Sequence, residues 1–389
     1  MNNNLETIVI NKWREIDDAQ DFMECHVADI RARSKTPENV VPVPLPPKEL
    51  IIEPNVCAEN ASDAALIMIN ILSKNYGTHN IASNALALAE NIGSNKVKPF
   101  IKFDKDVSPI ACAALVKISE SEIELGRAAC IPGQNGGNGE LMIKAFEQWK
   151  NNILFPESKI LRAEVRTAKA TREVPGGQAT QAICLGKIGL TPTAIVPMFH
   201  HGIPDRQEIF LLASIIKDRE RSISEIDKVL PNIIGDKNER KIFEIFWQKF
   251  FGKLPNFSDC TFDQVDSNDL EAKISGPIIE IRKSEKPNCV EESINSFFNN
   301  DGRFALARIS MDLPIEHIFN KSLRLRKIGF RLAGFEPVIN DGKISIDILF
   351  GKLSEKGKEV MVLPSFTENI FSHREEELLI QSSILWRQN

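Results

Sequence analysis

The chain of 389 residues has no apolar run that approaches the roughly 20 residues a helix needs to span a bilayer. It also lacks an excess of basic residues, since 48 Lys and Arg against 53 Asp and Glu give a formal net charge of −5. The first absence argues against a membrane protein, and the second argues against a nucleic-acid binder. The opening segment, Met1–Glu6, lacks the features of a signal peptide.

Cysteine pairs with metal-ligand or redox spacing are also lacking. The seven cysteines are scattered, and none forms a Cys-x-x-Cys pair, which is typical of reduced thiols in a cytoplasm. We therefore expect a cytoplasmic protein with no metal site. Charged residues make up 26% of the chain, an ordinary globular composition, and its length favours two domains.

The most distinctive feature that is present is a glycine-rich turn between a strand and a helix. An apolar strand reaches Pro132, four glycines follow within seven residues, and an amphipathic helix begins near Asn138. The helix has one apolar face, made of Leu141, Met142, Ala145, Phe146 and Trp149. Glycines let the backbone pass close to a ligand, and the helix N-terminus beyond them favours phosphate.

Two common nucleotide-binding motifs fit this turn poorly. A dinucleotide fingerprint would need a small residue where Met142 stands, and no Gly-Lys-Ser/Thr follows, as a P-loop would require. An ordinary surface turn is the simplest alternative to a phosphate site.

The spacing Gln134-x-x-Gly137-x-Gly139 resembles the pyrophosphate loop of the GNAT N-acetyltransferases. Further along, Lys187-Ile188-Gly189-Leu190 is similar to the signature that closes the next helix in that family. The resemblance covers about residues 49–216. It implies a GNAT fold of the α/β class, a mixed and mostly antiparallel central sheet flanked by helices.

The apolar periodicity of the chain fits the order of elements in that fold. We predict helices over 61–74 and 80–91, a helix from 138, and a further helix that ends near 190. The predicted strands cover 49–53, 98–103, 110–119, 124–132, 159–167, 193–199 and 208–213.

The resemblance implies an N-acyltransferase that moves an acetyl or other acyl group from a CoA thioester to an amine. It also implies a set of CoA-binding residues: Ala129, Cys130, Ile131, Gln134, Asn135, Gly136, Gly137, Asn138, Gly139, Glu140 and Gln178. The acceptor, a small molecule or a peptide, is left open. So are the acyl chain length, an acyl carrier protein as donor, and a homodimer.

Candidate catalytic residues follow from family positions. Glu124 occupies the place of a frequent general base, Glu164 is its substitute, and His200 is a candidate on the acceptor side. The alternative for each residue is a solvated or ion-paired side chain without a catalytic role. The family's usual tyrosine acid is absent, because Leu185 stands at its position and the only tyrosine is Tyr76.

The C-terminal half repeats part of the pattern. Residues 304–310 echo 160–166, and Leu325–Phe330 echoes Leu185–Leu190, with two further strands over 331–338 and 343–350. The segment that would replace the glycine turn, Lys283–Asn288, has no glycine. We therefore expect a tandem protein with a degenerate second copy, and chance similarity of short strands is the alternative.

The predicted organisation has three parts. Residues 1–48 form an extension with a candidate helix at 16–32 and a proline-rich connector, 49–216 form the acyl-CoA domain, and 217–389 form the degenerate domain. The aromatic stripe over 242–251 predicts a core or interdomain helix. A non-catalytic protein that binds acyl-CoA or an acyl carrier is the alternative to the enzyme.

Overall fold

The computed structural model describes most of the chain from Leu50 onward. The described residues are 50–52, 61–76, 85–104, 108–132, 137–169, 177–199, 207–217, 229–258, 270–275, 278–283, 290–300, 302–340, 342–367 and 369–388. The candidate helix at 16–32, the proline-rich run and residues 284–289 lie outside them. Among the described residues, no helix has the length and apolar character needed to cross a membrane.

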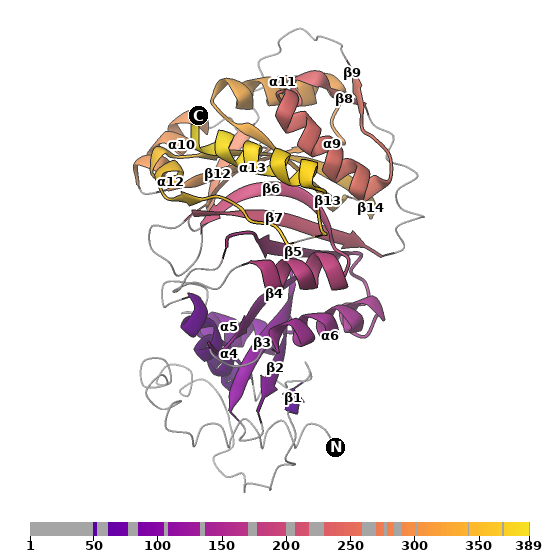
Figure 1. Cartoon of the computed structure of the whole chain (residues 1–389), viewed down its shortest axis with the longest axis vertical. Coiled ribbons are helices and arrows are strands. Elements are labelled where there is room, and N and C mark those ends of the chain that lie inside the picture. The colour runs from indigo at the N-terminus through magenta and orange to yellow at the C-terminus, as the bar shows by residue number, and fades with distance from the viewer. Residues whose placement is uncertain are drawn as a thin grey trace, which may run out of the picture. The chain divides into compact units, whose positions relative to one another are not determined.

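The described residues group into two compact units. The first unit includes the described residues up to Ser158, and the second includes those from Lys159 onward. The predicted domain boundary at 216 follows the sequence repeat rather than compactness, so it stays a prediction. Together the units contain helices and mixed, mostly antiparallel strands, as expected for the α/β class (Figure 1).

The first unit contains one four-stranded antiparallel sheet with neighbours in chain order. Its strands are β1 (Leu50–Ile52), β2 (Val97–Phe103), β3 (Pro109–Lys117) and β4 (Glu122–Cys130). Its helices are α4 (Ala61–Tyr76), α5 (Ala85–Gly93) and α6 (Asn138–Lys150).

The helices of the first unit cover both faces of this sheet. Alternate residues of β2 and β3, including Ile101 and Cys112, join the apolar cores of α4 and α5. The intervening residues face α6, because Lys102 reaches Glu140 on that helix. The five apolar residues predicted for one face of α6 are all buried, which confirms that prediction.

The second unit contains an eight-stranded sheet and a separate two-stranded one. The order of the larger sheet is β5-β7-β6-β13-β14-β12-β11-β10, and only its β11–β12 pair is parallel. Its strands are β5 (Ile160–Arg166), β6 (Thr191–Phe199), β7 (Gln207–Ile216), β10 (Leu270–Ser275), β11 (Ile278–Lys283), β12 (Phe304–Ser310), β13 (Arg331–Asn340) and β14 (Lys343–Leu353). Outside this path, β15 (Met361–Val362) pairs in parallel with β7, and β8 (Val229–Pro231) pairs with β9 (Asn256–Ser258).

The helices of the second unit are shorter on average. They are α7 (Gln178–Gln181), the π-helix η3 (Ala182–Lys187), the 3₁₀ turn η4 (Asn232–Ile234), α9 (Lys237–Phe251), α10 (Val290–Asn299), α11 (Ile315–Lys327), α12 (Glu355–Glu359) and α13 (His373–Gln388). The predicted helix ending near 190 is therefore present, but its last turns are π-helical. Hydrogen bonding from residue i to i−5 or i−6 there adds one residue to the final turn.

Two segments of the second unit have the same strand pairing. In β5–β7 (160–216) the first and second strands both pair antiparallel with the third, and the same is true of β12–β14 (304–353). Each middle strand carries a register shift at the same place, beside Thr193 in one and Ala333 in the other. Whether these segments belong to two copies of one domain, or are similar by chance, stays a prediction.

The two segments meet through their middle strands. Ala194 of β6 pairs antiparallel with Gly334 of β13, and each is the fifth residue after the glycine that ends the preceding helix. Gly334 has φ +142°, and a Cβ there would lie 2.3 Å from the Thr193 carbonyl oxygen. The close pairing of equivalent residues gives this pair of segments an approximate two-fold arrangement.

Helix α9 covers the junction of β6 and β13. Its side chains Phe243, Trp247, Phe250 and Phe251 surround Phe335 of β13, with ring centroids 5.2–5.6 Å from it. All five rings are buried. The aromatic stripe predicted as a core or interdomain helix therefore packs in the core of the second unit.

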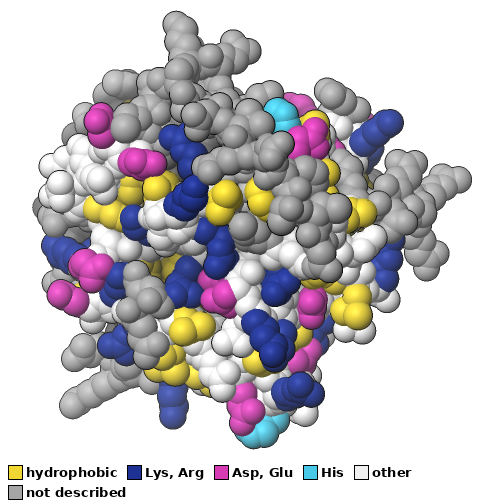
Figure 2. Space-filling model, turned by 90° about the horizontal axis from the view of Figure 1, so that it is seen from above, with side chains coloured by type: hydrophobic (Ala, Val, Ile, Leu, Met, Phe, Trp, Pro, Cys, Tyr) yellow, Lys and Arg dark blue, Asp and Glu magenta, His cyan; other side chains and the backbone are white. Residues whose placement is uncertain are grey.

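Charged side chains of both signs are spread over the surface drawn in Figure 2. Hydrophobic side chains appear there in small groups between them.

Candidate functional site

The candidate site starts from an irregularity in β4. Three residue steps from Gly126 to Ala129 lie opposite two steps from Ala114 to Cys112, so β4 carries one extra residue. Arg127 at this bulge has φ +51°, a left-handed conformation that is uncommon outside glycine. A bulge bends its strand and changes which groups pair, and bulges are frequent beside active sites.

The end of the glycine turn lies against the sheet. Gly137 has φ +124°, and a Cβ there would lie 3.1 Å from both the Ala111 Cβ and the Lys102 Cδ. Only glycine fits such a backbone at this separation. The predicted close approach of this turn to a ligand stays a prediction, and Gln134, Asn135 and Gly136 lie outside the described residues.

Helix α6 begins directly after Gly137 without a side-chain cap from that residue. The Asn138 side chain accepts a hydrogen bond from the Gly139 amide at 3.0 Å, and Leu141 donates to the Gly137 carbonyl. A helix N-terminus carries partial positive charge and amide donors, which suits an anion.

A lysine that the sequence analysis did not single out lies under this turn. Lys102 is 7% exposed, and its ammonium lies 2.9 Å from a carboxylate oxygen of Glu140 in the first turn of α6. The Glu140 side chain is 55% exposed, so the buried Lys102 side chain reaches the protein surface at this ion pair. No local signal singles out Lys102, because β2 also contains Lys98 and a strand with polar residues on one face is usually half exposed.

The other predicted CoA-binding residues of β4 and its exit are partly engaged within the unit. Ala129 is buried in the core with α4 and α5. The Cys130 carbonyl accepts a hydrogen bond from the Asn75 amide at 2.8 Å, and the Ile131 amide donates to Ile110. Burial raises the pKa of the Cys130 thiol, so at neutral pH it is not a thiolate nucleophile.

Glu124, the predicted base, is half-buried on the face of β4 that α4 and α5 cover, opposite Val116. Its carboxylate folds back over Gly126, where a Cβ would meet an oxygen at 2.5 Å. Burial lowers the pKa of the nearby Arg127, and the charge of Glu124 acts in the opposite direction.

The remaining candidates belong to the second unit. Glu164 is exposed on β5 opposite Leu212, and Gln178 is the first residue of α7. The Gln178 carbonyl accepts a hydrogen bond from the Thr367 hydroxyl at 3.1 Å. His200 lies outside the described residues, so the proposed roles of these three residues stay predictions.

The position of the missing tyrosine falls inside the π-helix. Leu185 is half-buried there, and its neighbour Cys184 is fully buried. Burial raises the pKa of the Cys184 thiol to about 12, so this thiol stays protonated and does not act as a nucleophile at neutral pH. In the part of the chain that the structure describes, no group of three His, Cys, Asp or Glu residues could hold a metal ion.

No protein-family model matches this chain, and no curated protein matches it either. Among solved structures it is similar to a protein from Desulfovibrio desulfuricans described as a member of the GNAT family, at 12% identity over 43% of this chain and 98% of that one, with a TM-score of 0.29. The ribosomal-protein-S18-alanine N-acetyltransferase from Escherichia coli is 14% identical over 43% of this chain and 93% of that one, with a TM-score of 0.30.

The spermidine N-acetyltransferase from Vibrio cholerae, solved in complex with CoA and spermine, is 12% identical over 44% of this chain and 96% of that one, with a TM-score of 0.31. These similar structures are GNAT-type acetyltransferases, but they leave more than half of this chain uncovered.

Proposed function

We propose that this protein is an N-acyltransferase that transfers an acyl group, by default acetyl, from a CoA thioester to an amine. The observation that carries the proposal is the bulged strand β4 followed by the glycine turn, Gly137 lying on the sheet, and the N-terminus of α6. This arrangement suits a pyrophosphate site, because Gly137 lies too close to Ala111 and Lys102 for a side chain and the amide donors of a helix N-terminus follow it.

In this proposal the backbone from Asn135 to Glu140, together with Gln134, holds the pyrophosphate. Lys102 adds a cation beneath the turn, and its present partner Glu140 is mostly exposed. A bound phosphate would compete with that carboxylate for the lysine, which makes Lys102 a phosphate-positioning residue. Ala129, Cys130, Ile131 and Gln178 are proposed to contact the rest of the CoA molecule.

The proposed reaction needs a free amine and a leaving group. The amine nitrogen attacks the thioester carbonyl, the carbon–sulfur bond breaks, and the amine proton passes to a base. Glu124 is the proposed base, with Glu164 or His200 as substitutes. With leucine at position 185, we propose that the CoA thiolate takes its proton from water.

We also propose a tandem organisation in which 49–216 is the acyl-CoA domain and 217–389 is a GNAT-like domain without a phosphate loop. The matching strand pairing of 160–216 and 304–353 supports it. The acceptor is a small-molecule or peptide amine. An acyl carrier protein as donor, a homodimer and a cytoplasmic location remain part of the proposal.

A second function is favoured by one observation. Position 185, where the family's usual tyrosine acid would stand, is leucine. This absence suits a non-catalytic protein that binds acyl-CoA or an acyl carrier. Comparing wild type with Glu124→Gln in a CoA-release assay with a panel of amines separates the two, because only the enzyme has turnover to lose, about 10²–10⁴-fold.

Calorimetry with CoA and acetyl-CoA tests the shared binding step. Gly137→Val should abolish binding, because its side chain would occupy the cradle against Ala111 and Lys102. Gly342→Val is the matched control, since Gly342 also has positive φ but no atom lies within 4 Å of its Cβ position. A wild-type protein that binds neither thioester nor CoA contradicts both functions, unless it binds an acylated carrier protein.

A further inference from the structure

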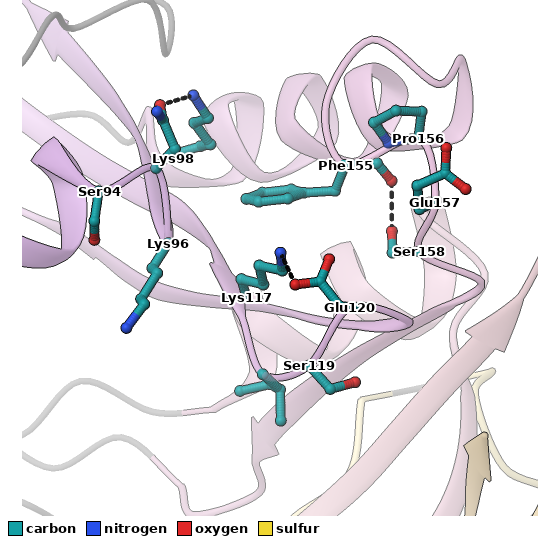
Figure 3. Close-up of a pocket in the computed structure, with 12 residues that line it drawn as sticks. Ser94, Lys96, Lys98, Lys117, Ser119, Glu120, Phe155, Pro156, Glu157 and Ser158 are labelled. Atoms are coloured by element: carbon teal, nitrogen blue, oxygen red, sulfur yellow. Dashed lines mark hydrogen bonds and ion pairs between the residues drawn. The ribbon is translucent and has the colours of Figure 1, made fainter. Parts of the chain in front are cut away.

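A hollow lies at the C-terminal end of α6, away from the glycine turn. Three segments of the first unit, 94–98, 117–120 and 155–158, surround a cavity of about 630 Å³, which we call the Phe155 hollow (Figure 3). Its volume is in the range of pockets that hold small organic molecules.

This hollow is separate from the proposed CoA loop. The glycine turn precedes α6, whereas Phe155 and Ser158 follow it, and a helix of 13 residues is about 20 Å long. Along β2, Lys98 lines the hollow and Lys102 lies under the glycine turn, about 13 Å apart for four strand residues. A ligand in one site therefore does not overlap the other.

The segment 155–158, which lines the hollow, is fixed by hydrogen bonds of its buried residue Ser158. Ser158 is 1% exposed, accepts a hydrogen bond from the Trp149 indole at 2.7 Å and donates one to the Phe155 carbonyl at 2.7 Å. Phe155 has φ +49°, a conformation that bulky residues rarely adopt. Such conformations persist where their surroundings fix them, and they cluster at ligand sites.

The ring of Phe155 enters the hollow. In Figure 3 it extends between Lys98 and Lys117, which come from two neighbouring strands. Ile118 and Pro156 add apolar surface, and the Ile118 side chain is 52% exposed, unusual for a large aliphatic residue. An aromatic group bound here would stack on one ring and cover this surface.

The charges around the ring are mainly positive. Lys96, Lys98 and Lys117 line the hollow, against Glu120 and Glu157. Glu120 pairs with Lys117, but its side chain is 86% exposed, so water and salt weaken this pair. Glu157 is exposed as well.

Lys98 is the ammonium with the most to gain from an anion. It donates a hydrogen bond of 2.6 Å to the neutral side-chain oxygen of Asn95, and no ion pair between described residues includes it. Burial lowers the pKa of Lys98, because its charge is partly removed from water. A bound dianion would supply the missing opposite charge.

We propose that the Phe155 hollow binds a small aromatic phosphate monoester, with its ring on Phe155 and its phosphate beside the lysines that line the hollow. A phosphate monoester carries a charge of about −1.5 to −2 at pH 7, which suits several ammonium groups better than a single carboxylate does. This site goes beyond the proposed acyl transfer and does not depend on it.

A calorimetric titration of the full-length protein with phenyl phosphate tests the proposal. Wild type should bind phenyl phosphate at least tenfold more tightly than inorganic phosphate or phenol. Lys98→Gln should weaken binding about tenfold or more, and Phe155→Gly should remove the preference over inorganic phosphate while keeping the left-handed backbone. Glu120→Gln should tighten binding, because it frees Lys117 from its carboxylate partner.

Lys150→Gln is the matched control, since Lys150 ends α6 and contacts Phe146 outside the hollow. An unchanged thermal unfolding midpoint verifies that each variant is folded. The proposal is overturned if millimolar phenyl phosphate does not bind, or if Lys98→Gln and Phe155→Gly bind as wild type does. Tighter binding of a phosphotyrosine peptide would also overturn it, in favour of a protein partner.

The CoA experiment is independent of this one. Lys98→Gln should leave CoA binding unchanged, and Gly137→Val should leave phenyl phosphate binding unchanged. A protein that binds phenyl phosphate but neither CoA nor an acylated carrier protein supports the site in the Phe155 hollow and contradicts the proposed acyl transfer. Loss of phenyl phosphate binding in Gly137→Val places the aromatic phosphate in the glycine turn and refutes the separate site.

Discussion

The segments β5–β7 and β12–β14 have the same strand pairing but different chemistry on it. Ala194 of the first segment pairs with Gly334 of the second. Two residues later, the first segment has the buried Val196 and the second has Glu336. The glycines that end the preceding helices, Gly189 and Gly329, have nearly equal φ values of +81° and +88°. The backbone conformation is therefore kept where side chains differ, and the side chains decide what each segment can bind.

One difference in charge between the segments lies at Glu336. Its carboxylate binds Arg162 of β5 at 3.0 Å and Arg308 of β12 at 3.2 Å, so one residue of the second segment joins both segments. Arg162 also donates to the Pro337 carbonyl at 2.9 Å. Val196, at the matching position, can form no such ion pairs. The two-fold arrangement therefore applies to the backbone. These ion pairs do not follow it, because Glu336 has no charged counterpart at position 196.

The substitution with the largest expected effect on the pairing of the two segments is Gly334→Val. Its side chain would clash with Thr193 and Ala194, and valine tolerates φ +142° poorly. We expect a loss of about 4 kcal/mol or more in the free energy of unfolding, measured with urea, from strain and overpacking together. Gly342→Val is the control, because its open surroundings leave only the conformational cost. Equal losses in both variants would mean that β6 and β13 do not pair closely.

A smaller effect is expected from Glu336→Gln. The substitution keeps the shape but leaves Arg162 and Arg308 without their carboxylate, at side-chain exposures of 17% and 21%. Breaking a pair at such burial should cost about 3 kcal/mol of unfolding free energy. Glu120→Gln, which breaks an exposed pair, should be close to neutral. If both variants unfold at the same urea concentration, Glu336 does not connect the segments.

Periodicity was enough to predict the regular parts of this fold. The spacing of Leu141, Phe146 and Trp149 predicted the buried face of α6, because a helix repeats every 3.6 residues. Strands such as 304–310 were predicted with their observed bounds. The order of elements from 50 to 216 also follows the expected one, since each element is a local pattern in the sequence.

The features that depend on distant contacts could not be predicted in this way. The bulge at Arg127 has no local signal, because the residue is not glycine and its φ is imposed by pairing with β3. Lys102 looks like a surface residue of a strand until α6 covers it. Likewise, the pairing of Ala194 with Gly334 joins residues 140 positions apart, and only the folded sheet brings them together.

The smallest predicted effect concerns the helix ends that precede β6 and β13. In the first segment the Leu190 amide donates to the Cys184 carbonyl, and in the second the Phe330 amide donates to the Leu325 carbonyl. Cys184 and Leu325 are both fully buried, so a titratable thiol stands where the second segment has an aliphatic chain. Only the first helix end should therefore respond to alkaline pH.

The thiol's ordinary pKa is 9.0, and burial raises it to about 12 in the folded protein. Between these values the unfolded chain loses the proton and the folded protein keeps it, so stability falls as pH rises above 9. From pH 8 to pH 10 the loss is about 1.4 kcal/mol for one thiol. We expect the difference in unfolding free energy between wild type and Cys184→Ala to shrink by that amount over this range. Urea unfolding at both pH values measures it, and a difference that stays constant would show that Cys184 ionises normally in the folded protein.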